Sequence, residues 1–376
     1  MTPIRVLLDA TCVNDDAPTG ASRYVQSLVR ALVGAGECEL HVFTFARHVF
    51  SDVPNLVTVS RLDLPRALGP VARETSRRRF VARAARNGFA LVHFTLDPAP
   101  PLSGTRSVLT LFDIARRSPS FRAATGASLR ALVRTHLRYG LAKSMDMLIA
   151  TTMHAAREIE TELPFPSRKI RVSPIATDPA FTPGEPDSRI LARFGLTSRD
   201  YILFVGQMGR QKNEDGLLAA FRIAKRRCTI PERTMLAFAG DPSQASARTR
   251  DAVRDSPDAI ALGIVHDSDL VHLYRGAVCL ALPSFIEGYG LPVQEAMACG
   301  TPTIISADTC LVEIAGDAAI AVDPRSVEEM SAALTRLAYD RDLRDRLSRR
   351  GLERSVARTD TEMARAHLEA YRDALR

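Results

Sequence analysis

Two glutamates, Glu287 and Glu295, stand on either side of a glycine-rich turn in the stretch LALPSFIEGYGLPVQEAMACGTPTIIS, residues 280–306. The apolar start predicts a strand, the Pro-Ser after it a loop, and PVQEAMA a helix that begins near a proline. Gly288 and Gly290 can expose main-chain N–H groups just before that helix, which favours binding of anions and hydroxyl groups. The alternative is a solvated Glu287 and a Glu295 that only favours the helix dipole. Two acids around one such turn favour a ligand site.

The elements that must hold these residues are short apolar runs that alternate with amphipathic helices. Runs of this near-continuous, β-branched kind are typical of parallel strands that are buried on both faces. A helix is predicted from about residue 20 to residue 33, where apolar residues form one stripe before two glycines. We expect strands at residues 4–10, 39–45, 56–60, 91–95, 107–113, 147–152, 169–175, 201–207, 234–240, 260–265, 277–283, 301–306 and 318–324.

A Pro-, Gly- and Asp-rich break, TDPAFTPGEPDS, divides this alternation into two βαβ series. We therefore expect an α/β protein of two Rossmann-like doubly wound domains that face a central cleft, with ligands at the carboxyl ends of the strands. The expected parts are an N-terminal domain at 1–180, a linker at 181–198, a C-terminal domain at 199–355, and a C-terminal helix at 356–376 that packs back on the N-terminal domain.

Composition and charge narrow the class of protein. The chain has 376 residues and a net charge of +7, which favours anionic partners such as nucleotide phosphates or acidic lipids. No nucleic-acid-binding signature accompanies the charge, so nucleic acid is not an expected partner. The six cysteines have the spacing of neither a disulfide framework nor a zinc site. Neither a signal peptide nor an apolar run of membrane-spanning length is recognisable, and a cytoplasmic protein is expected.

The stretch PSFIEGYGLPVQEAMACGTP closely resembles the donor-site signature of the retaining GT-B glycosyltransferases of family four, also called glycosyl transferases group one. The resemblance is specific because the two glutamates at this spacing, Gly-aromatic-Gly-Leu-Pro and Glu-Ala-Met-Ala-Cys-Gly-x-Pro match together. It extends to LYRGAVCLALPSF, to VEIAGDAAIAVDP and to SPIATDPAFTP at the hinge. It implies the GT-B fold, with the acceptor in the first domain and a nucleotide-diphosphate sugar in the second.

The resemblance implies separate roles for the two glutamates. Glu295 would hold the ribose hydroxyls of the donor, and Glu287 would face the donor sugar near the reacting centre. The main-chain amides of the turn between them would hold sugar hydroxyls and phosphate. These residues are Gly288, Tyr289, Gly290 and Leu291.

The cations of the implied site lie in VGQMGRQKNEDGLLAAF, residues 205–221, after the first strand of the second domain. Lys212 matches the family's phosphate lysine. Arg210 stands near the partner arginine, although the usual Arg-Lys-Asn is here Arg-Gln-Lys-Asn, and Gly206 is a further donor-binding candidate. Together the two cations would neutralise the leaving diphosphate. Two solvated basic residues are the alternative, and their place at the end of a strand favours the site.

In the first domain, DAPTGASRYVQSLVRAL resembles the family's first glycine loop and helix. Gly20 would let the chain approach the donor phosphate, with the helix N-terminus behind it. Tyr24 lies on the apolar stripe and is expected in the core. Asp15 and Asp16 could contact an acceptor, but a solvated loop is the stronger expectation.

One departure from the family lies after the strand SVLTLF, where the usual His-Asp appears as Phe112 and Asp113. Asp113 stays a catalytic candidate. A phenyl ring in place of the histidine that faces the donor sugar would suit a less polar sugar face, such as that of a deoxy sugar. His93, at the end of another strand, fits a family position and a packed core histidine about equally well.

The expected transfer needs no metal and no cofactor, because no Asp-x-Asp at a strand end resembles a metal site. HDSDL, residues 266–270, is interpreted as a helix start capped by Asp267 or Ser268. The family implies retention of anomeric configuration without an enzymatic nucleophile. The departing phosphate would take the acceptor's proton on the same face, while Glu287 orients the sugar.

These features predict an enzyme that moves a hexose or deoxyhexose from a GDP-, UDP- or dTDP-sugar to a hydroxyl of a saccharide, lipid-linked or small-molecule acceptor. Bacterial cell-surface polysaccharide, lipopolysaccharide or another glycoconjugate is the expected product. Basic amphipathic segments at 66–89 and 121–145 favour peripheral docking on an anionic membrane and ordinary solvated faces about equally. A soluble secondary-metabolite acceptor, a nucleotide-sugar epimerase and a non-catalytic donor-binding partner protein remain alternatives.

Overall fold

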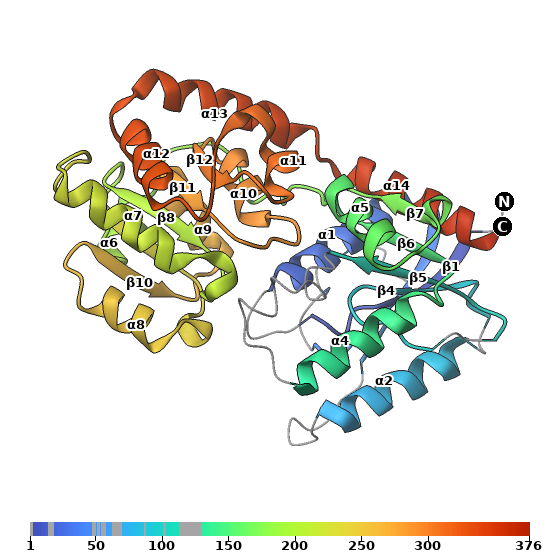
Figure 1. Cartoon of the computed structure of the whole chain (residues 1–376). Helices are drawn as coiled ribbons and strands as arrows, with labels where there is room; N and C mark the ends of the chain where they lie inside the picture. Colours follow the sequence, from blue (N-terminus) through green and yellow to red (C-terminus); the bar gives the residue numbers. More distant parts are fainter. Residues whose placement is uncertain are drawn as a thin grey trace. The chain divides into compact units, whose positions relative to one another are not determined.

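The computed structural model describes residues 3–13, 19–46, 50, 53, 58–61, 70–85, 88–100, 103–112 and 129–376. These residues form two compact units. Unit 1 contains the described residues up to Phe112, those from Leu129 to Ala176, and the C-terminal segment Arg358–Arg376. Unit 2 contains Thr177–Ala357. The colours of Figure 1 follow the chain through both units.

Unit 1 is built on a sheet of seven parallel strands in the order β3-β2-β1-β4-β5-β6-β7. From β1 to β3 the chain adds strands towards one edge of the sheet, and from β4 to β7 it adds strands towards the other edge. The direction therefore reverses between β1 and β4, which is a topological switch point. The strands are β1 Ile4–Asp9, β2 Cys38–Thr44, β3 Thr58–Arg61, β4 Leu91–Phe94, β5 Arg106–Leu111, β6 Met147–Ala150 and β7 Ile170–Val172.

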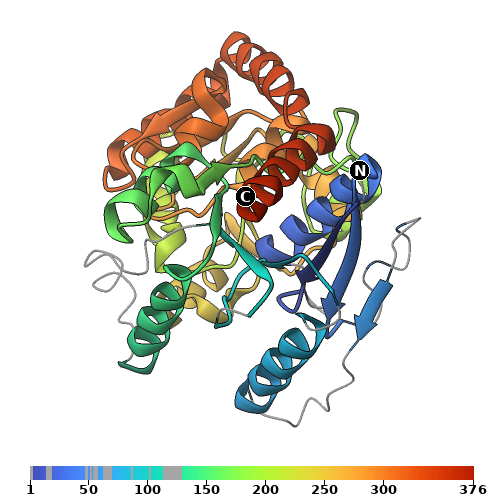
Figure 2. The ribbon, with the colours of Figure 1, turned by 90° about the vertical axis from the view of Figure 1, so that its right-hand side faces the viewer.

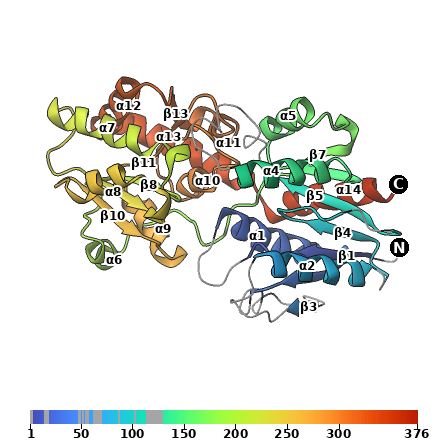
Figure 3. The ribbon, with the colours of Figure 1, turned by 60° about the horizontal axis from the view of Figure 1, so that its bottom comes forward.

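The helices of unit 1 begin and end where the sequence supplies caps. The Thr19 hydroxyl accepts a hydrogen bond from the Ser22 N–H at the start of α1, and Gly36 ends this helix in the left-handed conformation at φ 66°. Figure 3 shows α2 lying beside β1 and β4. The helices are α1 Gly20–Ala35, α2 Pro70–Ala85, α4 Leu129–Ala142, α5 Met153–Glu162 and α14 Asp360–Leu375, with a 3₁₀ turn at Ser167–Lys169.

The last helix, α14, belongs to unit 1 although unit 2 precedes it in the chain. It lies beside α1 (Figure 2). Arg30 Nε is 2.8 Å from Asp360 Oδ2 at its first turn, and the Tyr24 hydroxyl is 2.9 Å from His367 Nε2 in its middle. Tyr24 and His367 are both fully buried. A polar contact inside the core therefore joins the two helices.

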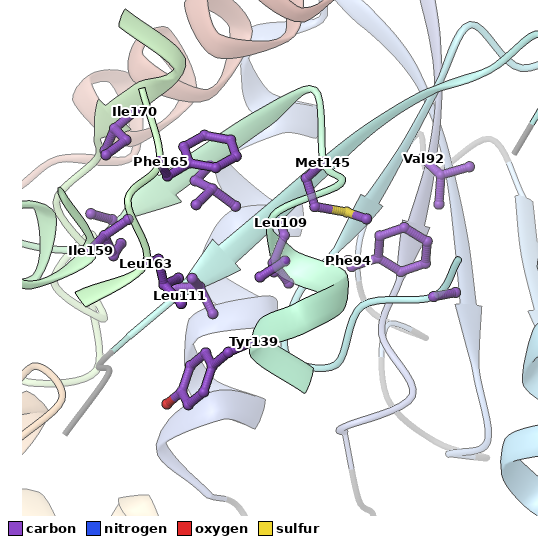
Figure 4. Packing of buried hydrophobic residues seen from close by; sticks show 14 of the residues in the cluster. Val92, Phe94, Leu109, Leu111, Tyr139, Met145, Ile159, Leu163, Phe165 and Ile170 are labelled. Carbon is purple, nitrogen blue, oxygen red and sulfur yellow. The ribbon is translucent and has the colours of Figure 1, made fainter. Parts of the chain in front are cut away.

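One apolar cluster fills the space between the unit 1 sheet and the helices on one of its faces. Figure 4 shows Leu109 and Leu111 of β5 among side chains from β4, α4 and α5. The buried Tyr139 of α4 and Ile159 of α5 belong to the same cluster. Each large side chain that is fully buried in this way contributes about 1.5–3 kcal/mol to folding.

Unit 2 has a sheet of six parallel strands in the order β10-β9-β8-β11-β12-β13. Its switch point lies between β8 and β11, and the order is that of a dinucleotide-binding Rossmann sheet. The strands are β8 Tyr201–Val205, β9 Met235–Ala239, β10 Ala259–Gly263, β11 Cys279–Leu282, β12 Thr303–Ser306 and β13 Ala319–Val322. The helices are α6 Ser188–Arg193, α7 Glu214–Arg226, α8 Ala247–Arg254, α9 Asp267–Gly276, α10 Leu291–Ala298, α11 Leu311–Ala315, α12 Val327–Tyr339 and α13 Arg341–Val356, with 3₁₀ turns at Arg210–Lys212, Pro242–Gln244 and Gly316–Ala318.

The structure confirms the predicted fold class, because every expected strand is present and both sheets are doubly wound and parallel. Helix α6 lies within the segment 181–198 that the sequence suggested as a linker. The predicted cap of α9 is wrong. The helix begins at Asp267, and His266 occupies the cap position without a side-chain cap hydrogen bond. Within the described ranges, no helix has the length and apolar character needed to cross a membrane.

Candidate functional site

Two neighbouring loops meet at the switch point of the unit 2 sheet. The β8 loop (residues 206–213) follows β8, and the β11 loop (residues 283–290) follows β11, the strand that pairs with β8. Both loops leave the carboxyl ends of parallel strands, where sheets of this kind bind ligands. The strand order thus brings together the two segments that the sequence marked as functional.

Hydrogen bonds hold the two loops to each other. The Gln211 carbonyl accepts the Phe285 N–H at 2.8 Å and the Ile286 N–H at 3.4 Å. Asn213 donates from Nδ2 to the carbonyl of Pro283 at 3.1 Å and to that of Pro324 at 2.6 Å, and it is 6% exposed. Asn213 has φ 58° and ψ 36°, a left-handed conformation that asparagine tolerates better than most residues. No pattern in the sequence indicated this anchoring role of Asn213.

Two glycines let the β8 and β9 ends approach each other closely. Gly206 has φ 147° and Gly240 has φ 145°, values that side chains rarely adopt. A Cβ on Gly240 would overlap the Gly206 carbonyl. Gly206 also lies beside Lys212, because the Lys212 Cε would be 3.8 Å from a Cβ at position 206. The structure therefore brings Gly206 and Lys212 together in one turn.

The centre of the site is an ion pair between the two loops. Lys212 donates from Nζ to Glu287 Oε2 at 2.6 Å, and the two side chains are 21% and 8% exposed. Lys212 is one of only four lysines among the 50 basic residues of the chain. One of its three N–H donors is engaged by a residue that the structure describes. A cation with donors to spare therefore lies beside a mostly buried carboxylate.

The turn between the two glutamates is held by the side chains of Gln294 and Cys310. The Tyr289 side chain is 4% exposed and donates from its hydroxyl to Gln294 Oε1 at 2.6 Å. The Cys310 thiol bonds to the carbonyls of Glu287 at 3.2 Å and Tyr289 at 3.4 Å. Gly290 has φ 106°, and a Cβ there would overlap Leu311. Tyr289 therefore presents its main chain, rather than its ring, to the face of the loop.

Helix α10 begins at Leu291 directly behind this turn, with Gly290 as its cap residue and no side-chain cap. Glu295 is the fifth residue of the helix and therefore lies beyond its first turn. Its carboxylate accepts a hydrogen bond from the fully buried Tyr274 hydroxyl at 2.8 Å, and the residue is 4% exposed. Tyr274 thus fixes one oxygen of Glu295.

Arg210 and Glu214 lie at the two ends of the Lys212 turn. Arg210 is exposed, and its side chain makes no hydrogen bond or ion pair with the part of the chain that the structure describes. Glu214 is 1% exposed at the start of α7, and its Oε2 lacks a hydrogen-bond partner among the described residues. Burial raises the pKa of the Glu214 carboxyl, against hydrogen bonds from its own N–H and that of Gly209. No pattern in the sequence indicated this buried acid.

The candidates of the first domain lie in unit 1. Gly20 is the exposed first residue of α1, preceded by the Thr19 cap. Phe112 follows β5, and its ring meets the Tyr24 ring edge-on at 5.0 Å between centroids. Asp113 lies outside the described residues, as do Asp15 and Asp16.

His93 and Tyr24 belong to a buried polar network of unit 1. Both side chains contact the Thr110 hydroxyl, Tyr24 at 2.7 Å and His93 at 2.8 Å. His93 also contacts the Tyr371 hydroxyl at 2.8 Å, and His367 contacts the Ser173 hydroxyl at 2.9 Å. Burial lowers the pKa of His367 to about 4 and that of His93 well below its usual range. His93 is therefore a core histidine, and Tyr24 packs as predicted.

No group of three or more His, Cys, Asp and Glu side chains suited to a metal ion occurs among the residues that the structure describes. The polar groups of the unit 2 site are instead one ammonium, one exposed guanidinium, two carboxylates and main-chain amides. This set can neutralise a phosphate and bind vicinal hydroxyls.

Two family profiles match the chain. The profile of the glycosyl transferases group 1 matches residues 190–354, and that of glycosyltransferase family 4 matches residues 18–181. Together they cover most of both units.

Curated relatives share about a third of the residues over the matched segments. An O-antigen chain mannosyltransferase B of Escherichia coli is 31% identical over 229 residues, which are 58% of this chain and 58% of that protein. A D-inositol 3-phosphate glycosyltransferase of Thermobifida fusca is 30% identical over 242 residues, which are 61% of this chain and 56% of that protein. The match thus spans little more than half the length of these relatives.

Solved structures share the fold over nearly the whole chain. Anabaena HepE, solved in complex with UDP and glucose, superposes with a TM-score of 0.76 at 14% identity, over 97% of this chain and 98% of that one. The two profiles and this shared architecture lead to one conclusion: the chain belongs to the glycosyltransferases of family 4, the group 1 glycosyl transferases, and has their two-domain GT-B fold.

Proposed function

We propose that this protein is a retaining, metal-independent glycosyltransferase that moves a hexose or deoxyhexose from a nucleotide-diphosphate sugar to a hydroxyl acceptor. One observation carries the proposal: Lys212 and Glu287, from two loops, meet at 2.6 Å at the switch point of the unit 2 sheet. A diphosphate and a sugar are the two parts of a donor, and the pair offers a cation for one and a carboxylate for the other.

Lys212 supplies charge where the reaction creates it. Cleavage of the bond between the sugar and the diphosphate leaves a negative charge on the leaving phosphate, and a fixed cation lowers the energy of that state. Without donor, Glu287 holds the ammonium in place through their hydrogen bond. On binding, the remaining N–H donors of Lys212 take phosphate oxygens, and exposed Arg210 adds a second cation.

The two carboxylates act on the hydroxyls of the donor. Glu287 orients the sugar and stabilises the positive charge that develops on it as the bond breaks. Glu295, whose carboxylate Tyr274 holds in place, accepts the ribose hydroxyls. The main chain of Gly288, Tyr289, Gly290 and Leu291, together with the start of α10, faces the sugar and phosphate. Gly20 at the start of α1 is proposed as a further phosphate contact, and Asp113 as a catalytic group.

The transfer proceeds on one face of the sugar. The bond between the anomeric carbon and the phosphate oxygen breaks, and the acceptor oxygen forms its bond to the same carbon from the same side. The acceptor's proton passes to the departing diphosphate, so the products are a glycoside and a nucleoside diphosphate. No side chain is required as a nucleophile in this scheme.

The relatives suggest which donors and products to test first. HepE was solved with UDP and glucose, and the Escherichia coli relative is named an O-antigen chain mannosyltransferase. UDP-glucose, GDP-mannose and a dTDP-deoxy sugar are therefore the first donors, and we propose a role in cell-surface polysaccharide or another glycoconjugate.

The test is a donor panel read by thermal shift, followed by nucleotide release with saccharide acceptors and NMR of the product's anomeric configuration. We expect one donor to stabilise the protein and Lys212→Gln to lower turnover about 10²–10³-fold, as loss of one group that stabilises transition-state charge does. Lys143→Gln, an exposed lysine of unit 1, is the matched control. An inverted product would overturn retention, and an EDTA-sensitive turnover would overturn metal independence.

The same assay separates the alternatives. An isomerised donor in the absence of acceptor would identify an epimerase. Specific donor binding without turnover on saccharide, lipid-linked or small-molecule acceptors would identify a non-catalytic donor-binding protein, and either result would overturn the proposed function.

A further inference from the structure

Unit 1 has its own cavity at its own switch point. About 330 Å³ of space lies at the carboxyl ends of β1, β2 and β4 and against α2, a size within the range of small-molecule sites. β1 and β4 are the pair of strands between which the order of this sheet reverses. The cavity therefore occupies the place in unit 1 that the Lys212–Glu287 pair occupies in unit 2.

The only guanidinium in the described lining has no donor left for a ligand. Arg77, whose side chain is 5% exposed, donates from Nη1 to Asp9 Oδ2 at 2.5 Å and to the Asp97 carbonyl at 3.0 Å. Its Nε and Nη2 donate to the two Glu74 oxygens at 2.8 and 2.9 Å, and Nη2 also to the Pro98 carbonyl at 3.4 Å. These bonds use all five N–H groups of the side chain.

The hydroxyl and thiol groups of the lining are also turned towards the protein. The hydroxyls of Thr11 and Thr95 donate to the Asp9 carboxylate and carbonyl, each at 2.6 Å. The Cys12 sulfur lies 3.4 Å from the Thr95 hydroxyl. Burial raises the pKa of the Cys12 thiol to about 12, so it is uncharged at neutral pH.

What the lining offers to a ligand is hydrogen-bond acceptors and one aromatic ring. The Glu74 and Asp97 side chains are 39% and 62% exposed. Burial raises the pKa of Glu74, but the hydrogen bonds from Arg77 and Arg78 outweigh it and lower the pKa below its usual range. Arg138 approaches Asp97 at 3.4 Å without lining the cavity. Arg78 contacts Glu74 in the same way at 2.6 Å, so three guanidiniums accompany Asp9, Glu74 and Asp97, and the described lining side chains offer a ligand acceptors rather than cationic donors.

We propose that this cavity is the acceptor subsite of the enzyme and that it takes a hydroxyl-rich sugar or polyol whose groups inside the cavity carry no phosphate or carboxylate. That the ligand of this cavity is an acceptor rests on the proposed function. The physical reason is hydrogen-bond matching: sugar hydroxyls and amino groups can donate to the carboxylates of the lining, while phosphate oxygens need donors that Arg77 has already used. The ring of Phe45 offers an apolar wall for the C–H face of such a ligand.

The test uses pairs of probes that differ by one phosphate: myo-inositol with inositol 3-phosphate, and glucosamine with glucosamine 6-phosphate. Binding is measured by ligand-observed NMR titration of the full-length protein at low salt, without and with UDP. We expect the unphosphorylated member of each pair to bind at least about tenfold more tightly, since a phosphate that leaves water and finds no available donor in the cavity loses hydrogen bonds. Equal or tighter binding of the phosphorylated members would overturn the proposal.

Variants locate the effect in the cavity. Asp97→Asn together with Glu74→Gln removes two negative charges from the rim, and we expect it to reduce the discrimination within each pair to below about threefold. Glu160→Gln, an exposed acid of α5 in the same unit, is the control and should leave the ratio unchanged. If the double variant does not fold, Asp97→Asn alone should reduce the ratio in part. An unchanged ratio in folded variants would overturn the assignment.

The donor panel and the probe titrations together distinguish an error in the acceptor assignment from an error in the proposed function. If the donor panel shows binding and turnover while phosphorylated acceptors are preferred, the acceptor inference is wrong and the glycosyltransferase assignment stands. If no donor binds but the unphosphorylated probes still bind through Glu74 and Asp97, the cavity is a polyol site and the proposed transfer is wrong.

Discussion

The two switch points of the molecule have the same topology and opposite hydrogen-bonding character. At β8 and β11 a lysine uses one donor on Glu287 and keeps others for a ligand. At β1 and β4 an arginine uses all five donors on Asp9, Glu74 and two carbonyls. The first arrangement suits an anion, and the second leaves a wall of acceptors. Topology thus sets where a ligand can bind, and the use of the donors sets which kind.

The choice of cation has a physical basis in both places. A guanidinium is planar and can saturate five acceptors in fixed directions, which makes Arg77 a cross-brace between β1 and α2. An ammonium is a compact charge on a flexible chain, so Lys212 can divide its donors between Glu287 and a ligand. Of the two ion pairs, one therefore holds the fold, and the other keeps donors for a ligand.

The largest expected effect is on the free energy of unfolding, and it distinguishes the two ion pairs. Arg77→Met leaves Asp9, which is 3% exposed, without its cation and should lower the free energy of unfolding by about 3–5 kcal/mol. Lys212→Met should cost less, because Lys212 makes one hydrogen bond to the described residues where Arg77 makes five, although it too leaves a mostly buried carboxylate without its cation. Denaturant titration of both variants measures the difference. Similar losses for the two variants would contradict the distinction between a brace and a site.

The next effect is on turnover in unit 2. Glu287→Gln keeps the shape of the side chain but removes the negative charge that, in the proposed mechanism, supports the positive charge developing on the sugar. We expect kcat to fall about 10²–10³-fold while the Kd of the nucleotide changes by less than about threefold. Glu353→Gln, exposed on α13, controls for the loss of one charge. A kcat equal to that of the wild type would remove Glu287 from the mechanism.

The two units should also respond to acid in opposite directions. Burial lowers the pKa of His367 to about 4. On acidification, the unfolded chain therefore binds a proton at His367 near pH 6.5, whereas folded unit 1 binds it only near pH 4. Stability of unit 1 should therefore fall by about 3 kcal/mol as pH drops through this window. In unit 2, burial raises the pKa of Glu214, and acid relieves its buried charge.

Hydrogen exchange at pH 7 and pH 4.5, compared between peptides of α14 and of α7, measures this difference. His367→Asn should flatten the pH response of unit 1, and His154→Asn, on the surface of α5, should not. Loss of protection in α7 ahead of α14 on acidification would contradict the prediction.

The smallest expected effect concerns donor choice. The family resemblance places residue 112 against the donor sugar, and Phe112 here packs edge-on against Tyr24. Phe112→His would add a hydrogen-bonding group and should shift the ratio of kcat/KM values towards a fully hydroxylated hexose, relative to a deoxyhexose, by about tenfold. Competition between the two donors, read by mass of the product, measures the shift. An unchanged ratio would show that this position does not select the donor.

Much of the fold followed from the sequence because parallel strands that are buried on both faces must be almost wholly apolar. Runs such as YILFVGQ and AVCLALP were therefore visible as strands without any tertiary information. The cap of α9 was placed one or two residues too late, since capping depends on the conformation of the residue before the helix.

The unit 2 site was predictable in part for a similar reason. Glu287, Gly290 and Glu295 lie within one strand-loop-helix segment, so their spacing alone indicated a shared edge. The sequence did not reveal that Tyr274 holds Glu295, that Asn213 ties two loops together, or that Glu214 is buried. Each of these depends on residues that are distant in the chain, and no local pattern records such contacts.

By itself, the sequence determined the two doubly wound sheets, the loops at their carboxyl ends and the residue types available there, since periodicity and glycine placement are local properties. Only the tertiary structure decided that Lys212 meets Glu287 with donors to spare, and that Asp9, Glu74 and Arg77 form one saturated cluster beside a cavity. Whether the hydrogen-bond donors of a charged group are already used within the protein or remain for a ligand depends on its neighbours in space. Strand order, rather than sequence spacing, sets those neighbours.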